Sequence, residues 1–127
     1  RGGALTCVLG CGGDRDAAKR PLMAAAAEQY AQQVVLTSDN PRSEAPQTIL
    51  NQMRAGLQRM EQAVVMVDRA QAIAHTVQHA GTHDVVLVAG KGHEDYQEIA
   101  GVKHPFSDVQ QARAALAARA QQGSAHV

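Results

Sequence analysis

Residues 34–42 read VVLTSDNPR, and this stretch decides the fold. Its first five residues form a short apolar run of the kind that builds a buried strand, and its last four are polar, charged or proline residues typical of a loop. In an open parallel sheet, the loops at the carboxyl ends of the strands surround the ligand crevice. Residues 39–42 are therefore a candidate ligand-binding loop.

Two further stretches repeat this arrangement. Residues 5–9 read LTCVL and lead into the glycine-rich residues 10–16, GCGGDRD. Residues 85–89 read VVLVA and lead into residues 90–94, GKGHE. Three such loops, each leaving a buried-type strand, should line one crevice.

The order of elements predicts an α/β fold. Strands are expected near residues 5–10, 34–38, 64–67 and 85–89, and helical patterns separate them. The apolar stripes of these helices are Leu22, Met23, Ala26, Ala27 and Tyr30 after Pro21; Ile49, Met53, Leu57 and Met60; Ile73, Ala74 and Val77 after an Asp68 cap; and Val109, Ala112 and Leu116 after a Ser107 or Asp108 cap. The alternation predicts a Rossmann-like three-layer sandwich with a mostly parallel sheet covered on both faces.

The end of the chain has a different pattern. Residues 96–99 and 102–106, around Gly101, predict a β-hairpin. Residues 121–127 are expected to form a disordered tail, so a single domain is expected over residues 1–120. The sequence shows no internal repeat and no linker.

Composition excludes several classes of protein. The 127 residues are 45% hydrophobic and carry 12 basic against 12 acidic side chains, so no global positive field is present to attract nucleic acid. With one Phe, two Tyr and no Trp, few rings are available to stack on bases. The sequence contains neither an apolar run of roughly 20 residues nor a signal pattern, so a cytoplasmic protein without membrane insertion is expected. Cys7 and Cys11 should be buried, reduced thiols on one side of a strand.

The glycine loop permits more than one interpretation. Gly10-Cys11-Gly12 could approach a pyrophosphate, with Asp39 binding a ribose hydroxyl, as in dinucleotide-binding proteins. Arg15 occupies the place of the third glycine, where a long charged side chain does not fit a close helix–strand contact. A tight turn alone would also explain the glycines, but it leaves the charged residues 14–16 unexplained.

The chemistry of the other two loops matches a zwitterion. Arg42 can hold a carboxylate with two parallel hydrogen bonds, while Asp39 and Glu94 can hold an ammonium. A capped turn is the alternative for residues 39–42. The GKGHE loop is too short for a phosphate-binding Walker A loop. His75 and His79 have the spacing of two metal ligands but lack a third, so an exposed helix face is favoured over a metal site.

Four ordered motifs resemble one family. They are residues 11–16 (CGGDRD), 19–23 (KRPLM), 39–42 (DNPR) and 90–97 (GKGHEDYQ). In this order they closely resemble the C-terminal domain of the Mur ligases, in the branch that adds meso-diaminopimelate to UDP-N-acetylmuramoyl-L-alanyl-D-glutamate for peptidoglycan. The resemblance runs from about Leu5 to Ala118, and the arginine of the DNPR motif implies the diaminopimelate branch.

The resemblance also implies a set of site residues. The expected meso-diaminopimelate site consists of Arg15, Asp39, Asn40, Pro41, Arg42, Gly90 and Glu94, with Asp14, Lys91 and His93 in support. Arg15, Asn40 and Arg42 would hold ligand carboxylates, and Glu94 the distal ammonium. Diaminopimelate differs from lysine by its distal carboxylate, which is the anion that an arginine requires.

The family's reaction is ATP-driven amide formation through an acyl phosphate, with Mg²⁺. By resemblance, the ATP loop, the magnesium ligands and the nucleotide-sugar pocket belong to central and N-terminal domains that this sequence lacks, as it lacks a first strand–helix segment. The chain is thus expected to bind the amino acid, to hold no metal or nucleotide, and to be inactive alone. The alternative is a stand-alone module that binds an amino acid or nucleotide without catalysis.

Overall fold

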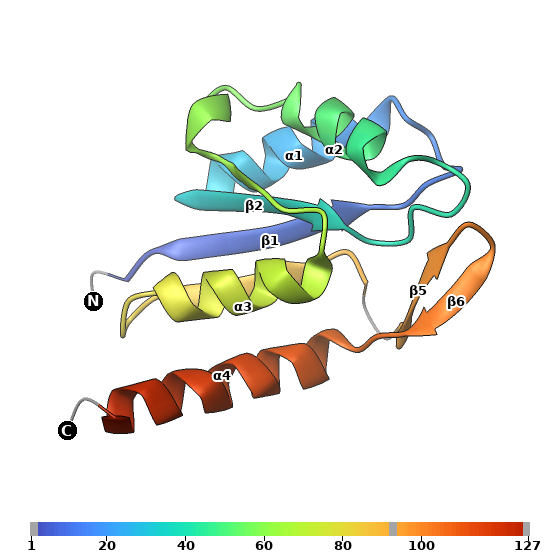
Figure 1. The fold of residues 1–127 in the computed structure, drawn as a ribbon. Coiled ribbons are helices and arrows are strands. Elements are labelled where there is room, and N and C mark those ends of the chain that lie inside the picture. The colour runs from blue at the N-terminus through green and yellow to red at the C-terminus, as the bar shows by residue number, and fades with distance from the viewer. Residues whose placement is uncertain (1–2, 92–93, 126–127) are drawn as a thin grey trace.

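The computed structural model describes residues 3–91 and 94–125, and its centre is a four-stranded parallel sheet (Figure 1). The strands are β1 (Leu5–Cys11), β2 (Gln33–Ser38), β3 (Val64–Val65) and β4 (Val85–Ala89), in the order β3-β2-β1-β4. Cys7 of β1 is in register with Val34 of β2 and Leu87 of β4. The predicted mostly parallel sheet is confirmed, although β3 is shorter than expected.

Helices cover both faces of this sheet, as a three-layer sandwich requires. Figure 1 shows α1 (Lys19–Tyr30) and α2 (Pro46–Arg54) on one face, and α3 (Arg69–His79) and α4 (Asp108–Ala125) on the other. A short 3-10 helix, η1 (Met60–Gln62), leads into β3. No helix in the described part of the chain is long and apolar enough to cross a membrane.

Alternation along β1 and β2 divides the core into layers. Cys7, Leu9 and Leu36 join the cluster under α1 and α2, whereas Val8 and Val35 point to the α3 side. Cys7 and Cys11 are buried and free, on the same side of β1. Burial raises the pKa of both thiols, so both remain protonated and unreactive at neutral pH.

The predicted buried stripe of α1 is wrong for most of its residues, although Ala27 packs against the core. Leu22 and Tyr30 are 67% and 76% exposed, whereas Arg20 and Ala24 are buried. Because the helix is rich in alanine, several of its faces are apolar, and the alanine face allows the closest approach to the sheet. The α4 stripe is wrong at two positions for the same reason, because Val109 and Leu116 are exposed and Ala115 is buried. Its third residue, Ala112, packs against the core as predicted.

The second helix also ends earlier than its apolar pattern predicted. A Cβ atom on Gly56 would lie 2.0 Å from the Pro21 carbonyl oxygen, so only glycine permits this approach of the two backbones. The helix ends at Arg54. Leu57 belongs to the loop that follows and is buried in the core. Met60 lies in η1 and is 36% exposed.

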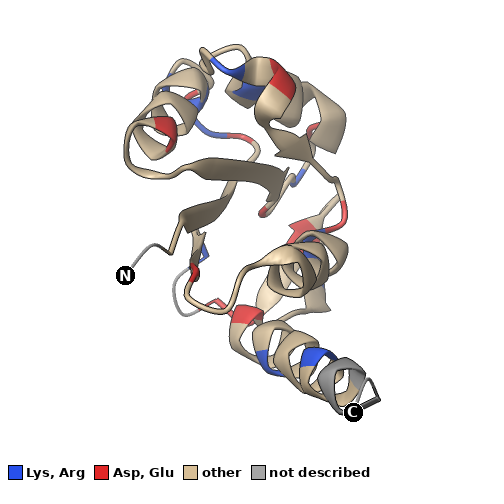
Figure 2. Cartoon of the chain, turned by 90° about the vertical axis from the view of Figure 1, so that its left-hand side faces the viewer, with Lys and Arg blue, Asp and Glu red and all other residues tan. Residues whose placement is uncertain are grey.

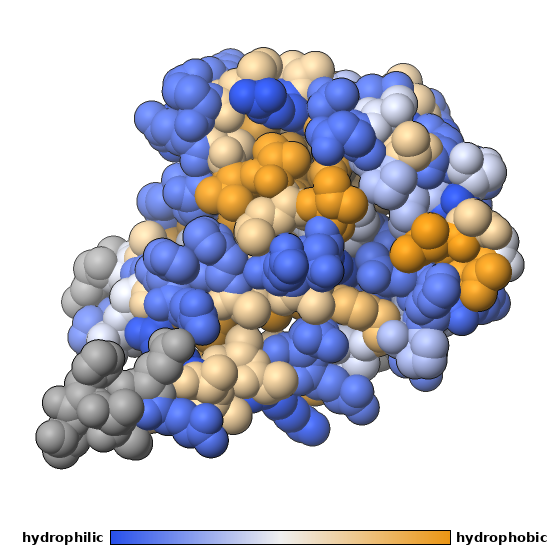
Figure 3. Space-filling view, viewed as in Figure 1, coloured by the Kyte–Doolittle hydropathy of each residue, from blue (hydrophilic) through white to orange (hydrophobic). Residues whose placement is uncertain are grey.

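Strand β4 was expected to be buried, but two of its apolar side chains are exposed. Val85 and Leu87 are 61% and 51% exposed because β4 is an edge strand, and α1 and α2 lie over β1 and β2 instead. Figure 3 shows further apolar side chains gathered over the β3 edge and at the end of the hairpin, where Ile99 and Val102 are exposed.

The hairpin and the last helix follow β4. Strands β5 (Tyr96–Ile99) and β6 (Val102–Pro105) form a separate antiparallel sheet, which confirms the predicted hairpin. Ser107 Oγ accepts the Gln110 amide at 3.3 Å and so caps α4, whereas Asp108 belongs to its first turn. The helix continues to Ala125, beyond the boundary predicted at residue 120.

The packing predicts a large difference between two leucines in strands. Leu36→Ala, in the fully buried core of β2, should lower the free energy of unfolding by about 3 kcal/mol because it leaves a cavity. Leu87→Ala, on the exposed face of β4, should cost less than about 1 kcal/mol. Urea denaturation of both variants measures this, and equal losses would contradict the assigned layers.

Candidate functional site

The loop of residues 39–42 lies at the carboxyl end of β2, where the sequence placed it. Asp39 and Asn40 are 8% and 1% exposed, so this loop is buried rather than open. The Arg42 amide donates to the Glu98 carbonyl at 2.9 Å, and the Ala100 amide donates to the Arg42 carbonyl at 2.7 Å. The hairpin therefore continues its hydrogen bonding onto the loop and covers it.

The side-chain amide of Asn40 joins three separate segments. Its Oδ1 accepts from Lys91 Nζ at 3.1 Å and from the Glu98 amide at 2.9 Å. Its Nδ2 donates to Glu94 Oε1 at 3.0 Å. Both ends of the buried amide are thus used within the protein, which fixes the positions of Lys91, Glu94 and β5 relative to the loop.

Lys91 is a buried cation between two carboxylates. Its side chain is 0% exposed, with Nζ 2.9 Å from Asp39 Oδ1 and 3.7 Å from Glu94 Oε1. Two carboxylates against one ammonium leave one net negative charge, and Glu94 is the more exposed of the two, at 36%. The negative charge that a ligand can reach is therefore at Glu94. The ammonium of Lys91 is not accessible to a phosphate, in agreement with the rejected Walker A interpretation.

The glycine loop packs directly on the same residues. The Gly13 amide donates to the Asn40 carbonyl at 2.7 Å, and a Cβ atom on Gly13 would lie 1.8 Å from the Pro41 oxygen. Asp14 has a positive φ of 55° and accepts hydrogen bonds from Ser43 through its carboxylate. Two of the three predicted loops thus meet through their backbones, and Asp14 holds the junction.

Two arginines converge on the same glycine loop. Arg42 has a φ of 53° and donates from Nη1 to the Gly13 carbonyl at 3.0 Å. A Cβ atom on Gly12 would lie 2.8 Å from Arg42 Nη1 and 3.5 Å from Arg15 Cγ, so both side chains approach this glycine. Arg15 is exposed and Arg42 is 17% exposed in its side chain, which leaves positive charge at the surface here.

Sequence reasoning missed a buried ion pair beneath this loop. Arg20 is 2% exposed; its guanidinium donates to both oxygens of Glu44, at 3.0 and 2.7 Å, and to the Gly12 carbonyl at 3.0 Å. Glu44 also accepts the Asp14 amide at 2.6 Å. The Arg20 hydrogen bond, followed by that of Asp14, lowers the pKa of Glu44 to about 2. Only its place in the KRPLM motif singled out Arg20.

A second missed pair ties the sheet to α4. Arg69 is 1% exposed and holds both oxygens of Asp108 at 2.7 Å. Its guanidinium also donates to the carbonyls of Ser38, at 3.0 Å, and Ala89, at 3.3 Å. These carbonyls end β2 and β4. No local pattern distinguishes this arginine from an exposed one in the first turn of a helix.

The remaining predictions concern Gly90, His93 and the ribose-binding role of Asp39. Gly90 follows β4 with a φ of 108°, and a Cβ atom on it would lie 2.9 Å from the Gly10 oxygen. His93 lies outside the described residues, so its supporting role stays a prediction. The pairing of Asp39 with Lys91 removes the ribose ligand that a dinucleotide interpretation requires.

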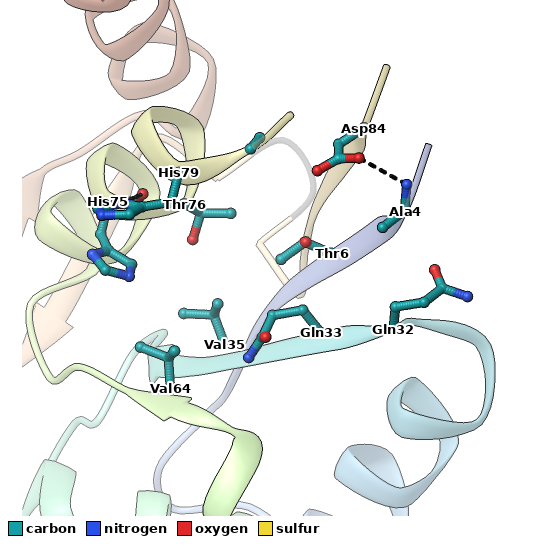
Figure 4. Close-up of a pocket in the computed structure, with 11 residues that line it drawn as sticks. Ala4, Thr6, Gln32, Gln33, Val35, Val64, His75, Thr76, His79 and Asp84 are labelled. Carbon is teal, nitrogen blue, oxygen red and sulfur yellow. Dashed lines mark hydrogen bonds between the residues drawn. The ribbon is translucent and has the colours of Figure 1, made fainter. Parts of the chain in front are cut away.

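The histidine pair lies at the opposite end of the sheet. Figure 4 shows His75 and His79 beside a cavity of about 340 Å³ that is also lined by Thr6, Gln33 and Asp84, near the amino ends of the strands. The two rings stack with their centroids 4.2 Å apart. Within residues 3–91 and 94–125, no group of three His, Cys, Asp or Glu side chains could hold a metal ion.

Charge around the molecule is local. Figure 2 shows basic and acidic residues interspersed along the chain. This agrees with the balanced composition and leaves the loop cluster to act through short-range contacts.

The Asn40 contacts predict an unequal response of two asparagines. Asn40→Ala should lower the free energy of unfolding by about 2 to 3 kcal/mol, because Lys91 and the Glu98 amide lose a buried acceptor. Asn51→Ala, at an exposed position on α2, should change it by no more than about 0.5 kcal/mol. Urea denaturation provides the comparison, and similar midpoints for the two variants would show that the buried hydrogen bonds of Asn40 do not stabilise the fold.

The lowered pKa of Glu44 predicts a pH-dependent contribution to stability. A carboxyl group whose pKa falls from 4.5 to about 2 on folding stabilises the protein above pH 4.5 and loses this effect as the pH approaches 2. Glu44→Gln should therefore be less stable than the wild type at pH 6, with the difference shrinking toward pH 2. Thermal denaturation from pH 2 to 6 tests this, with the exposed substitution Glu61→Gln as control. A constant gap across this range would rule out the effect.

Comparisons with known proteins agree with the fold described above. The family model described as "Mur ligase, glutamate ligase domain" matches residues 1–92. A UDP-N-acetylmuramoyl-L-alanyl-D-glutamate–2,6-diaminopimelate ligase of Ralstonia nicotianae is 61% identical over 119 residues, which cover 94% of this chain and 23% of that protein. The enzyme of the same name from Pseudomonas aeruginosa is 57% identical, with 90% and 23% covered.

A solved structure extends the likeness to three dimensions. The structure of a ligase with the same name superposes with a TM-score of 0.87 at 48% identity, over 91% of this chain and 24% of that one. The chain thus spans about a quarter of the length of these relatives. Since the family model matches well over half of it, the chain belongs to the Mur ligase family, through its glutamate ligase domain.

Proposed function

We propose that this chain binds and orients meso-diaminopimelate within an ATP-dependent ligase of peptidoglycan synthesis. One observation carries the proposal: the Arg42 guanidinium and the Glu94 carboxylate both contact Asn40. Arg42 Nη1 lies 3.5 Å from the Asn40 carbonyl oxygen, and Glu94 accepts the Asn40 side-chain amide at 3.0 Å. A guanidinium and a carboxylate fixed to one residue are complementary to the carboxylate and ammonium of an amino acid.

The named relatives indicate which amino acid this is. Their names specify 2,6-diaminopimelate, which has an amino acid group at each end. Arg42 and Arg15, both next to Gly12, would bind carboxylates, and Glu94 would bind the distal ammonium. Asn40 is 1% exposed and both its amide oxygen and its amide nitrogen are hydrogen-bonded within the protein, so we assign it to positioning these groups rather than to direct contact.

This chain would contribute to catalysis by holding the attacking amine in position. In the proposed reaction, ATP phosphorylates the D-glutamate carboxylate of the acceptor, and the amine of diaminopimelate then displaces phosphate to form the amide. Holding the amine at a fixed place and angle replaces a bimolecular encounter, which is a large source of rate enhancement. The described residues contain no group of three His, Cys, Asp or Glu side chains that could hold Mg²⁺, and Lys91 is paired with Asp39. Cofactor use is thus proposed for the whole ligase, whose cytoplasmic location likewise stays a prediction.

Arg42 provides the direct test. Arg42→Ala should weaken meso-diaminopimelate binding by about 1.5 to 3 kcal/mol, roughly 10- to 150-fold, because charge-assisted hydrogen bonds are lost. Lysine, which lacks the distal carboxylate, should bind equally weakly to both forms. NMR titration of the isotope-labelled chain measures the affinities through the backbone amides of residues 13–16, 39, 40, 42 and 94.

The controls separate the proposal from its alternatives. Arg54→Ala removes an exposed arginine of α2 and should leave binding unchanged. Unaltered affinity in Arg42→Ala would exclude Arg42 from the site. A response to NAD without one to diaminopimelate would favour a nucleotide-binding module. Amide formation or ATP hydrolysis by the pure chain alone would show that it does more than bind.

A further inference from the structure

Glu98 has its backbone fixed beside Arg42. The Glu98 amide donates to Asn40 Oδ1 at 2.9 Å, and its carbonyl accepts the Arg42 amide at 2.9 Å. The Ala100 amide completes the set by donating to the Arg42 carbonyl at 2.7 Å. The Glu98 side chain therefore leaves β5 at a defined place next to the candidate carboxylate subsite.

The carboxylate of Glu98 forms a loose ion pair with Arg42. Glu98 Oε1 lies 3.6 Å from Arg42 Nε, which is within ion-pair range but too long for a hydrogen bond. The two side chains are 28% and 17% exposed, so solvent screens the attraction. A pair of this kind contributes little and exchanges readily for a better partner.

A second cation lies on the other flank of Glu98. Lys103 of β6 is directly opposite Glu98 in the antiparallel register, so the two side chains share one face of the hairpin. Lys103 Nζ lies 4.7 Å from the centre of the Tyr96 ring. Within the part of the chain that the structure describes, Lys103 forms no ion pair. Lys103 can therefore pair with the Glu98 carboxylate without breaking an existing ion pair.

We infer that Glu98 is an internal competitor for Arg42, displaced toward Lys103 when a ligand carboxylate arrives. This inference rests on the proposed function, because it assigns the Arg42 subsite to the distal carboxylate of diaminopimelate. In the free protein Glu98 restrains the Nε side of the guanidinium, which the Gly13 carbonyl also holds through Nη1, and partly neutralises its charge. The same contact lowers affinity for the ligand, since two carboxylates then compete for one arginine. Glu98 is thus a specificity-determining residue, because it affects only ligands that reach Arg42 with a carboxylate.

The substitution Glu98→Gln tests this because it keeps the size of the side chain and removes the charge. The variant should bind meso-diaminopimelate about two- to fivefold more tightly, the range expected for a partly exposed pair. Its affinity for lysine should not change, so the ratio between the two ligands rises. Glu61→Gln, in η1, is the matched control and should alter neither affinity. Calorimetric titration of the chain gives both constants.

A double substitution separates competition from a structural effect. In an Arg42→Gln background, Glu98→Gln should give no gain, because the competitor has lost its target. A gain that persists there, or equal gains for lysine and diaminopimelate, would overturn the inference. Unchanged or weaker diaminopimelate binding by Glu98→Gln alone would overturn it too.

A measurement without ligand keeps this result distinct from failure of the proposed function. Relaxation of the Arg42 Nε–H group by ¹⁵N NMR should show greater mobility in Glu98→Gln than in the wild type. Equal mobility would show that Glu98 does not hold the guanidinium and would reject the competitor. If this mobility increases but the wild type does not bind diaminopimelate, the proposed function fails and the pairing of Glu98 with Arg42 stands.

Discussion

The buried side-chain amide of Asn40 is the contact on which the candidate site depends. Few side chains can donate and accept at the same time, and Asn40 uses this property to bind a cation, a backbone amide and a carboxylate from different segments. Because each partner is itself held in place, removing the amide would leave several groups unsatisfied rather than one. The loop, Lys91, Glu94 and the hairpin are therefore joined at the carboxyl edge of the sheet.

The sequence predicted the architecture and the meeting of the loops because both follow from short-range patterns. Apolar runs bounded by glycine or charge identify strands, and the alternation with helices imposes a parallel sheet with its loops on one edge. The stripe of α1 was not predictable in this way, since alanine gives no contrast between faces and Ala24 is buried instead of Leu22. The exposure of β4 could not be predicted either, because edge strands and central strands can have the same valine-rich sequences.

The roles of individual charges could be predicted only in part. The motif indicated that Asp39, Asn40 and Arg42 act together, but not that Lys91 neutralises Asp39 from inside or that Glu98 reaches Arg42. These pairs join residues far apart in sequence, and no local spacing encodes them. The positive φ of Arg42, 53°, was also beyond sequence reasoning, because this conformation usually belongs to glycine. Hydrogen bonds from the hairpin on both sides of this residue maintain it.

Three buried cations show how the chain builds a polar site on a small apolar sheet. Arg20, Arg69 and Lys91 are each no more than 3% exposed, and each pairs with a carboxylate and with at least one amide or backbone oxygen. Burying such charges costs desolvation energy, so these pairs are a weak source of stability. Their effect is positional, because each joins a loop or strand end to a neighbouring element. Arg42 and Glu94 then lie at the edge of this framework with their side chains held by Gly13 and Asn40, and a ligand that binds them would spend less free energy on ordering the protein.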